Sequence, residues 1–80
     1  DVIGTQKDTD YISSEFGKVW AQIDTKAGDF ISLEINIKNG VINIVVISTN
    51  LDTILLRKFL DQLAKIDTKK IKNFSGVINF

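Results

Sequence analysis

The chain carries few side chains of the kinds that catalyse reactions or bind metals. Histidine and cysteine are both absent from its 80 residues, which excludes thiolate nucleophiles, disulfides, histidine-based triads and nearly all zinc, copper and haem ligation. Two pairs of carboxylates stand out, Asp8 with Asp10 and Asp24 with Asp29. Acid–base or metal chemistry needs carboxylates that converge in a concave site, so on a linker and a turn these pairs indicate solvated charges. The sequence therefore predicts no catalytic residue, no metal and no cofactor.

Lysines form the second group with a chemical meaning. Lys65, Lys69, Lys70 and Lys72 gather at the end of an expected helix, where cations stabilise the helix dipole and keep a neighbouring strand from pairing. The alternative is a partner-binding patch. Ten Lys and Arg balance ten Asp and Glu, so no net field attracts nucleic acid or an anionic membrane. No apolar run is long enough for membrane insertion.

A β-hairpin is the clearest element that could position such groups. Apolar and polar residues alternate strictly over residues 31–38, which is typical of a strand with one buried face. Asn39-Gly40 follows and predicts a two-residue type I′ turn, which leads into a return strand over Val41–Ile47. The expected cross-strand pairs are Lys38–Val41, Ile37–Ile42, Asn36–Asn43, Ile35–Ile44, Glu34–Val45, Leu33–Val46 and Ser32–Ile47.

The two faces of this hairpin differ in polarity. One is wholly aliphatic and should face a helix. The other combines polar side chains with Val45 and Ile47, and is too apolar to be simply solvated, so we expect something to cover it in part.

A helix of about four turns is expected over Leu51–Ile66. Thr49 is the expected N-cap, which puts Asp52 at the third helical position, near the positive end of the dipole. Residues 74–80 return to an extended pattern and predict a final strand. One side of the helix is apolar and would pack on the sheet through Leu51, Leu55, Phe59, Leu63 and Ile66.

Residues 14–24 fit two patterns. Phe16, Val19, Trp20 and Ile23 have the spacing of an amphipathic helix, but residues 18–24 also alternate as a strand would. Gly17 costs a helix about 1 kcal/mol and favours a strand over Lys18–Asp24. The predicted fold is then a small α+β two-layer sandwich of order β-β-β-α-β, with one long amphipathic helix on an antiparallel sheet.

The ends of the folded part follow from composition. Residues 4–10 contain no apolar side chain, and we expect residues 1–12 to form a flexible segment or linker, although Val2 and Ile3 have the residue types of an edge strand. Residues 13–80 should form one domain. Because the chain begins with Asp1 and lacks Met, we expect it to be a segment of a longer protein.

The stretch from Ile23 to Leu63 resembles a known family, the C-terminal domain of the flagellar hook-length control protein and of the needle-length regulators of type III secretion. That family has alternating apolar residues, a Pro-Glu-x-Leu-Gly turn, two strands joined by a short turn, a polar segment and a Leu-rich helix. Two departures stand out: the chain has no Pro, and Phe30 looks like a one-residue insertion after Gly28. The matching segments are Ile23–Gly28 for the turn, Ile31–Ile35 and Val41–Ile47 for the strands, Ser48–Asn50 for the polar segment and Leu51–Leu63 for the helix.

The resemblance implies a function without chemistry. Such domains contact the cytoplasmic domain of the export-gate switch protein, and the type III apparatus then changes from early to late substrates. It also implies a monomer in the bacterial cytoplasm that is exported through this apparatus. The family's turn maps to Thr25, Lys26, Ala27 and Gly28. Together with the basic segment Lys69, Lys70 and Lys72, this turn is the candidate partner-binding site.

Other functions remain open from the residues alone. A small chaperone or an immunity-type protein would use the same layout as a binding surface, as a homodimer through the Val45 and Ile47 face. A ligand-binding domain would need a pocket that the sequence does not reveal. An enzyme fits least, because the chain has no His, no Cys and one Tyr.

Overall fold

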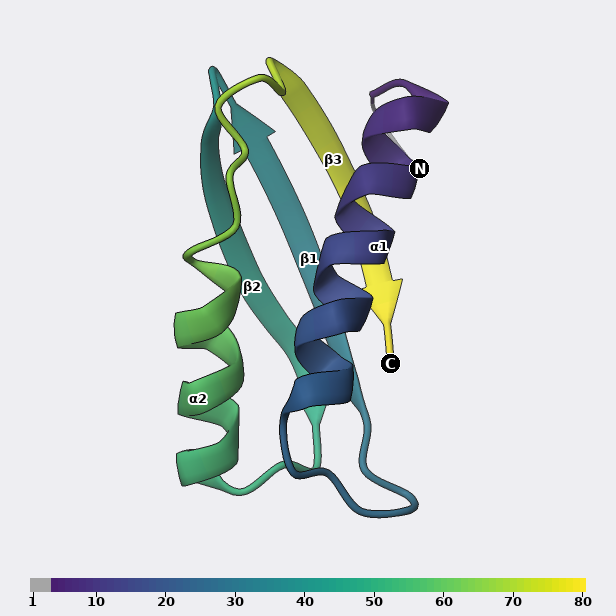
Figure 1. Ribbon diagram of the computed structural model, residues 1–80, viewed down its shortest axis with the longest axis vertical. Coiled ribbons are helices and arrows are strands. Elements are labelled where there is room, and N and C mark those ends of the chain that lie inside the picture. The colour runs from purple at the N-terminus through teal and green to yellow at the C-terminus, as the bar shows by residue number, and fades with distance from the viewer. Residues whose placement is uncertain (1–3) are drawn as a thin grey trace.

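The structure, a computed structural model, describes residues 4–80. Its elements follow in the order α1 (Gln6–Gln22), β1 (Ile31–Lys38), β2 (Val41–Thr49), α2 (Thr53–Leu63) and β3 (Asn73–Asn79). The strands form one antiparallel sheet in the order β2-β1-β3. Both helices lie on the same face of this sheet, with α2 on the β2 side and α1 toward β3 (Figure 1). The predicted α+β class, with a helix layer on an antiparallel sheet, is confirmed.

The β1–β2 hairpin follows the predicted register over most of its length. All six pairs from Leu33–Val46 to Lys38–Val41 are present. The turn residues Asn39 and Gly40 have φ angles of 53° and 80°, as a type I′ turn requires. The predicted pair of Ser32 with Ile47 is wrong, because a β-bulge lets Ser32 oppose Ser48 instead and leaves Ile47 unpaired.

The hydrophobic core lies between the inner face of the sheet and the two helices. The inner-face side chains of β1 are all buried, and Phe16 of α1 and Phe59 of α2 pack over them with no exposed surface. Trp20 joins the layers, because its ring lies 5.5 Å from both Phe59 and Phe80. The predicted contact of a helix with the aliphatic sheet face is therefore confirmed. The buried β1 residues are Ile31, Leu33, Ile35 and Ile37.

The predicted strand over Lys18–Asp24 is wrong, because residues 6–22 form the single helix α1. The apolar stripe beginning at Ile12 packs inward, and Ile12 and Phe16 are fully buried. Burial of one large apolar side chain contributes about 1.5–3 kcal/mol, which outweighs the cost of about 1 kcal/mol for glycine in a helix. The helical spacing in this segment was thus the informative pattern, and the observed order is α-β-β-α-β.

The prediction that residues 1–12 form a linker is also wrong over most of its length. The helix begins with an N-cap at Thr5, whose hydroxyl accepts a hydrogen bond of 3.0 Å from the backbone N–H of Asp8. The first turns of a surface helix can be polar on every side, so the lack of apolar residues up to Asp10 did not exclude a helix. The expected edge strand at Val2 and Ile3 lies outside the described residues.

Helix α2 is shorter than predicted at both ends. Its N-cap is Asp52, whose carboxylate accepts a hydrogen bond of 2.8 Å from the N–H of Leu55, so the prediction of Thr49 as cap is wrong. The Thr49 hydroxyl instead donates to the carbonyl oxygen of Phe30 at 2.8 Å. Thr49 therefore belongs to the end of the sheet. Neither helix among residues 4–80 has the length and apolar character needed to cross a membrane.

Candidate protein-interaction surface

The sheet face opposite the helices is open. Within residues 4–80 no helix or loop lies across it (Figure 1), so the expectation that something covers this face is wrong for the described part of the chain. We call this surface the open face. It consists of the outward-pointing side chains of the three strands.

Two exposed valines lie side by side with a charged residue in the middle of the open face, among side chains that are otherwise mostly polar. Glu34 on the central strand is flanked by Val45 of β2 and Val77 of β3, which lie directly opposite it. These two valines are 50% and 52% exposed. Antiparallel sheets that face water usually show polar residues there, whereas exposed apolar groups gathered on one face mark a binding surface. The large apolar side chains exposed on strand residues of this face are Val41, Val45, Ile47 and Val77.

A short polar network next to the valines is already satisfied within the chain. The amide of Asn36 donates to the carboxylate of Glu34 at 3.4 Å, and the hydroxyl of Ser75 donates to the Asn36 amide oxygen at 2.9 Å. These bonds hold the polar side chains flat along the sheet. A partner would therefore meet a preorganised surface with one negative charge between two valines.

The turn predicted from the resemblance is held by hydrogen bonds and lies at the end of β1 away from the hairpin. The N–H of Lys26 donates to the carboxylate of Asp29 at 2.8 Å, and the Asp29 N–H donates back to the Lys26 carbonyl oxygen at 3.0 Å. The side-chain amide of Asn50 donates to the Gly28 carbonyl oxygen at 3.0 Å. Lys26, Ala27 and Gly28 are exposed, whereas Thr25 is half-buried.

The basic segment lies beside the hairpin turn at the other end of the sheet. The N–H groups of Asn39 and Gly40 donate to the carbonyl oxygens of Lys72 and Ile71, at 2.7 and 2.9 Å, and the side chains of Lys69, Lys70 and Lys72 are exposed. The molecule is 33 Å long, and Figure 1 shows the two segments at its opposite ends. The structure therefore does not bring the turn and the basic segment into one site.

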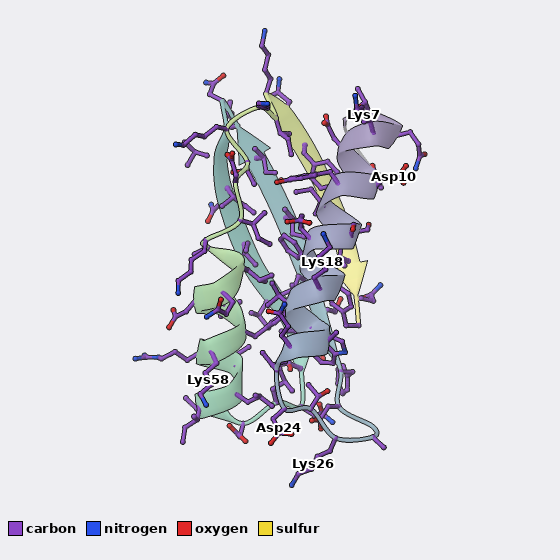
Figure 2. All side chains as sticks on the ribbon, in the orientation of Figure 1. Lys7, Asp10, Lys18, Asp24, Lys26 and Lys58 are labelled. Carbon is purple, nitrogen blue, oxygen red and sulfur yellow. The ribbon has the colours of Figure 1, made fainter. Side chains whose placement is uncertain are left out.

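The other charged side chains labelled in Figure 2 are spread over both helices and the loop after α1. Asp10 and Lys18 lie at different levels of α1, while Asp24 and Lys58 lie near the end where α1 stops (Figure 2). Lys18 makes an ion pair of 2.8 Å with Glu15, and this hydrogen bond and charge raise the pKa of the lysine. No group of three or more acidic side chains with metal-binding geometry occurs in residues 4–80.

Sequence reasoning identified Val45 and Ile47 as unusual but missed Val77. The signal for the first two was their place in a strand whose register the turn defines. The position of β3 beside β1 depends on the path of the chain after α2, and no local sequence pattern predicts that path. The open face as a whole was thus visible only in the folded chain.

No protein-family model, curated protein or solved structure matches this chain.

Proposed function

We propose that this chain is a non-catalytic protein-interaction domain whose partner docks on the open face. The observation that carries the proposal is the exposure of Val45 and Val77 on either side of Glu34, on a sheet whose other face holds the whole core. Leaving apolar groups in water has no benefit for the isolated fold, so their position favours an interface.

The partner that we propose is the cytoplasmic domain of a type III export-gate switch protein. The support is the resemblance to hook- and needle-length regulators, whose two strands and Leu-rich helix occupy the places of β1, β2 and α2. Besides the missing Pro, the chain departs from the family in a further way. The segment before the turn is the helix α1, whereas the family has alternating apolar residues there. In this function the domain makes and breaks no bond and acts by contact alone.

The test is a titration of the purified chain with that cytoplasmic domain. Val77→Lys removes an apolar side chain from the open face and places a cation next to Glu34, so the isolated fold should tolerate it. Ile54→Lys is the matched control, because Ile54 is also exposed (74%) but lies on α2.

We expect the native chain and Ile54→Lys to bind equally and Val77→Lys to bind about tenfold more weakly, a loss of about 1.4 kcal/mol. Equal binding by all three would remove the open face from the site. Absence of binding by the native chain would overturn the export-gate proposal.

A second candidate is a small chaperone or immunity-type protein that acts as a homodimer. Val45 and Ile47 favour it, because both are about half exposed, at 50% and 53%, on the edge strand β2. Titration with the export-gate domain separates the two candidates, because only the first requires that binding.

A further inference from the structure

The outer edge of β2 offers unpaired backbone groups. Ile31 and Phe80 exchange two backbone hydrogen bonds, of 3.0 and 2.9 Å, across β1 and the end of β3. Because bonding directions alternate along a strand, the odd-numbered residues of β1 turn toward β3 and the even-numbered ones toward β2. On β2, the residues opposite these even-numbered positions, such as Asn43 and Val45, form backbone hydrogen bonds with β1. The β2 residues between them point their N–H and C=O groups away from β1, toward the outer edge of the sheet. The outward groups belong to Ile42, Ile44 and Val46.

Nothing in residues 4–80 pairs with these groups. The backbone hydrogen bonds outside the regular elements include none from residues 41–49, and no side chain bonds to the backbone of Ile42, Ile44 or Val46. Natural edge strands are usually protected by charged residues or Pro. β2 contains neither, and its one protective feature is the bulge at Ile47. The stretch from Val41 to Val46 is therefore free to accept another strand.

We propose that β2 pairs antiparallel with β2 of a second copy, about a two-fold axis at Ile44, to form one six-stranded sheet. In this register Ile42 lies opposite Val46 of the second copy, and Asn43 lies opposite Val45. Side chains on the helix-covered face of one β2 then lie beside side chains on the same face of the other. These side chains are aliphatic in both copies, and no charged residues lie opposite each other.

The position of α2 leaves room for this pairing. An 11-residue helix is about 16 Å long, whereas the nine residues of β2 span about 30 Å. α2 runs back along β2 from its Thr49 end and projects beyond the edge of the sheet (Figure 1). It thus flanks only the half of β2 that is distant from the hairpin turn. The two-fold axis puts the second α2 beside the other half, so the two helices do not collide. There the second helix meets the connection of residues 64–69, which lines a groove with Val41 and Ile42.

This arrangement also completes the core at the open side of α2. Leu56 and Leu60 are half-buried and lie on the side of α2 that faces away from α1. In the dimer they lie next to Ile42 of the second copy, where they would cover apolar surface that a monomer leaves partly in water.

The dimer is independent of the proposed docking on the open face. It leaves that face uncovered and joins two copies of it into one surface. It departs from the monomer that the resemblance implies, and binding of the export-gate domain tests the proposed function separately from the dimer.

Amide hydrogen exchange on the native chain tests the pairing directly. We expect the mass to double with rising concentration and the amides of Ile42, Ile44 and Val46 to become protected at the same concentrations. The amides of Val77 and Asn79, which turn outward on the opposite edge, are the internal control and should keep exchanging. A chain that stays monomeric at millimolar concentration, or a dimer whose β2 amides exchange freely, overturns the proposal.

A matched pair of variants separates edge pairing from stacking through the open face. Val45→Lys and Val77→Lys replace valines of equal exposure on either side of Glu34, but only Val45 lies on β2. We expect Val45→Lys to raise the dimer dissociation constant about tenfold or more, because it brings two cations together across the axis. Val77→Lys should leave it unchanged. Equal weakening by both variants overturns the edge proposal, whereas a dimer that persists without export-gate binding refutes only the proposed function.

Discussion

At the scale of single residues, Gly17 lies in a helix without needing to be glycine. A Cβ atom built on it meets no neighbour within 4 Å. Gly17→Ala should therefore stabilise the chain by about 0.5–1 kcal/mol, because alanine loses less backbone freedom on folding into a helix. Urea denaturation of the two proteins measures the difference. A destabilised variant would argue against a helix across position 17.

Gly40 behaves in the opposite way. Its φ angle is 80°, and a Cβ atom there would lie 2.9 Å from the carbonyl oxygen of Lys69. We expect Gly40→Ala to destabilise the chain by about 1–3 kcal/mol, since strain and a close backbone contact add together.

Gly28→Ala separates the cost of backbone strain from the cost of the close contact at Gly40. Gly28 also has a positive φ, of 90°, but no atom lies within 4 Å of its Cβ position. In equilibrium denaturation it should cost less than Gly40→Ala. Equal losses would show that the contact with the basic segment contributes nothing.

At the scale of elements, the hairpin is specified twice over. The Asn39-Gly40 turn and the two alternating strands predict the same register, and a slip by one residue would move every side chain to the wrong face. α1 is specified less directly, because a helical stripe and a strand-like alternation share the same residues, and packing of Phe16 into the core decides between them.

The register makes neighbouring positions of β2 differ sharply. Ile44 points to the helices and packs against the core, whereas Asn43 is exposed on the open face opposite Asn36. We expect Ile44→Asp to abolish folding, because it places a carboxylate among apolar side chains. Asn43→Asp should change the free energy of unfolding by no more than about 0.5 kcal/mol. Circular dichroism separates the two outcomes, and similar losses would contradict the assignment of faces.

At the scale of the whole molecule, the basic segment can be tested apart from stability. Lys69 and Lys70 are exposed and make no ion pair within residues 4–80. Reversing both to Glu should leave the melting temperature nearly unchanged, since exposed charges contribute within about 0.5 kcal/mol. If the segment contributes to docking, association with an acidic patch on the export gate should become slower and more sensitive to salt.

Secretion profiling of cells that carry the protein measures the effect of this double variant. Loss of the early-to-late substrate change with a folded domain supports a role for the segment. Arg57→Glu with Lys58→Glu is the control for net charge, because both side chains are exposed on α2 and lie outside the basic segment. Normal switching by the Lys69 and Lys70 variant would exclude the basic segment from the site.

The sequence by itself determined the features that depend on neighbouring residues. The hairpin and its register, the core-facing side of α2 and the final strand all follow from local spacing and turn chemistry, which act over a few residues. The caps were less certain, because Thr49 and Asp52 both have suitable side chains and their hydrogen-bond partners are chosen in the folded chain. Only the tertiary structure decided that residues 6–22 are helical, that β3 lies beside β1, and that Val77 joins Val45 on an open face. These outcomes depend on which apolar side chains pack together although they are far apart in the sequence. The burial of such side chains is a property of the whole fold.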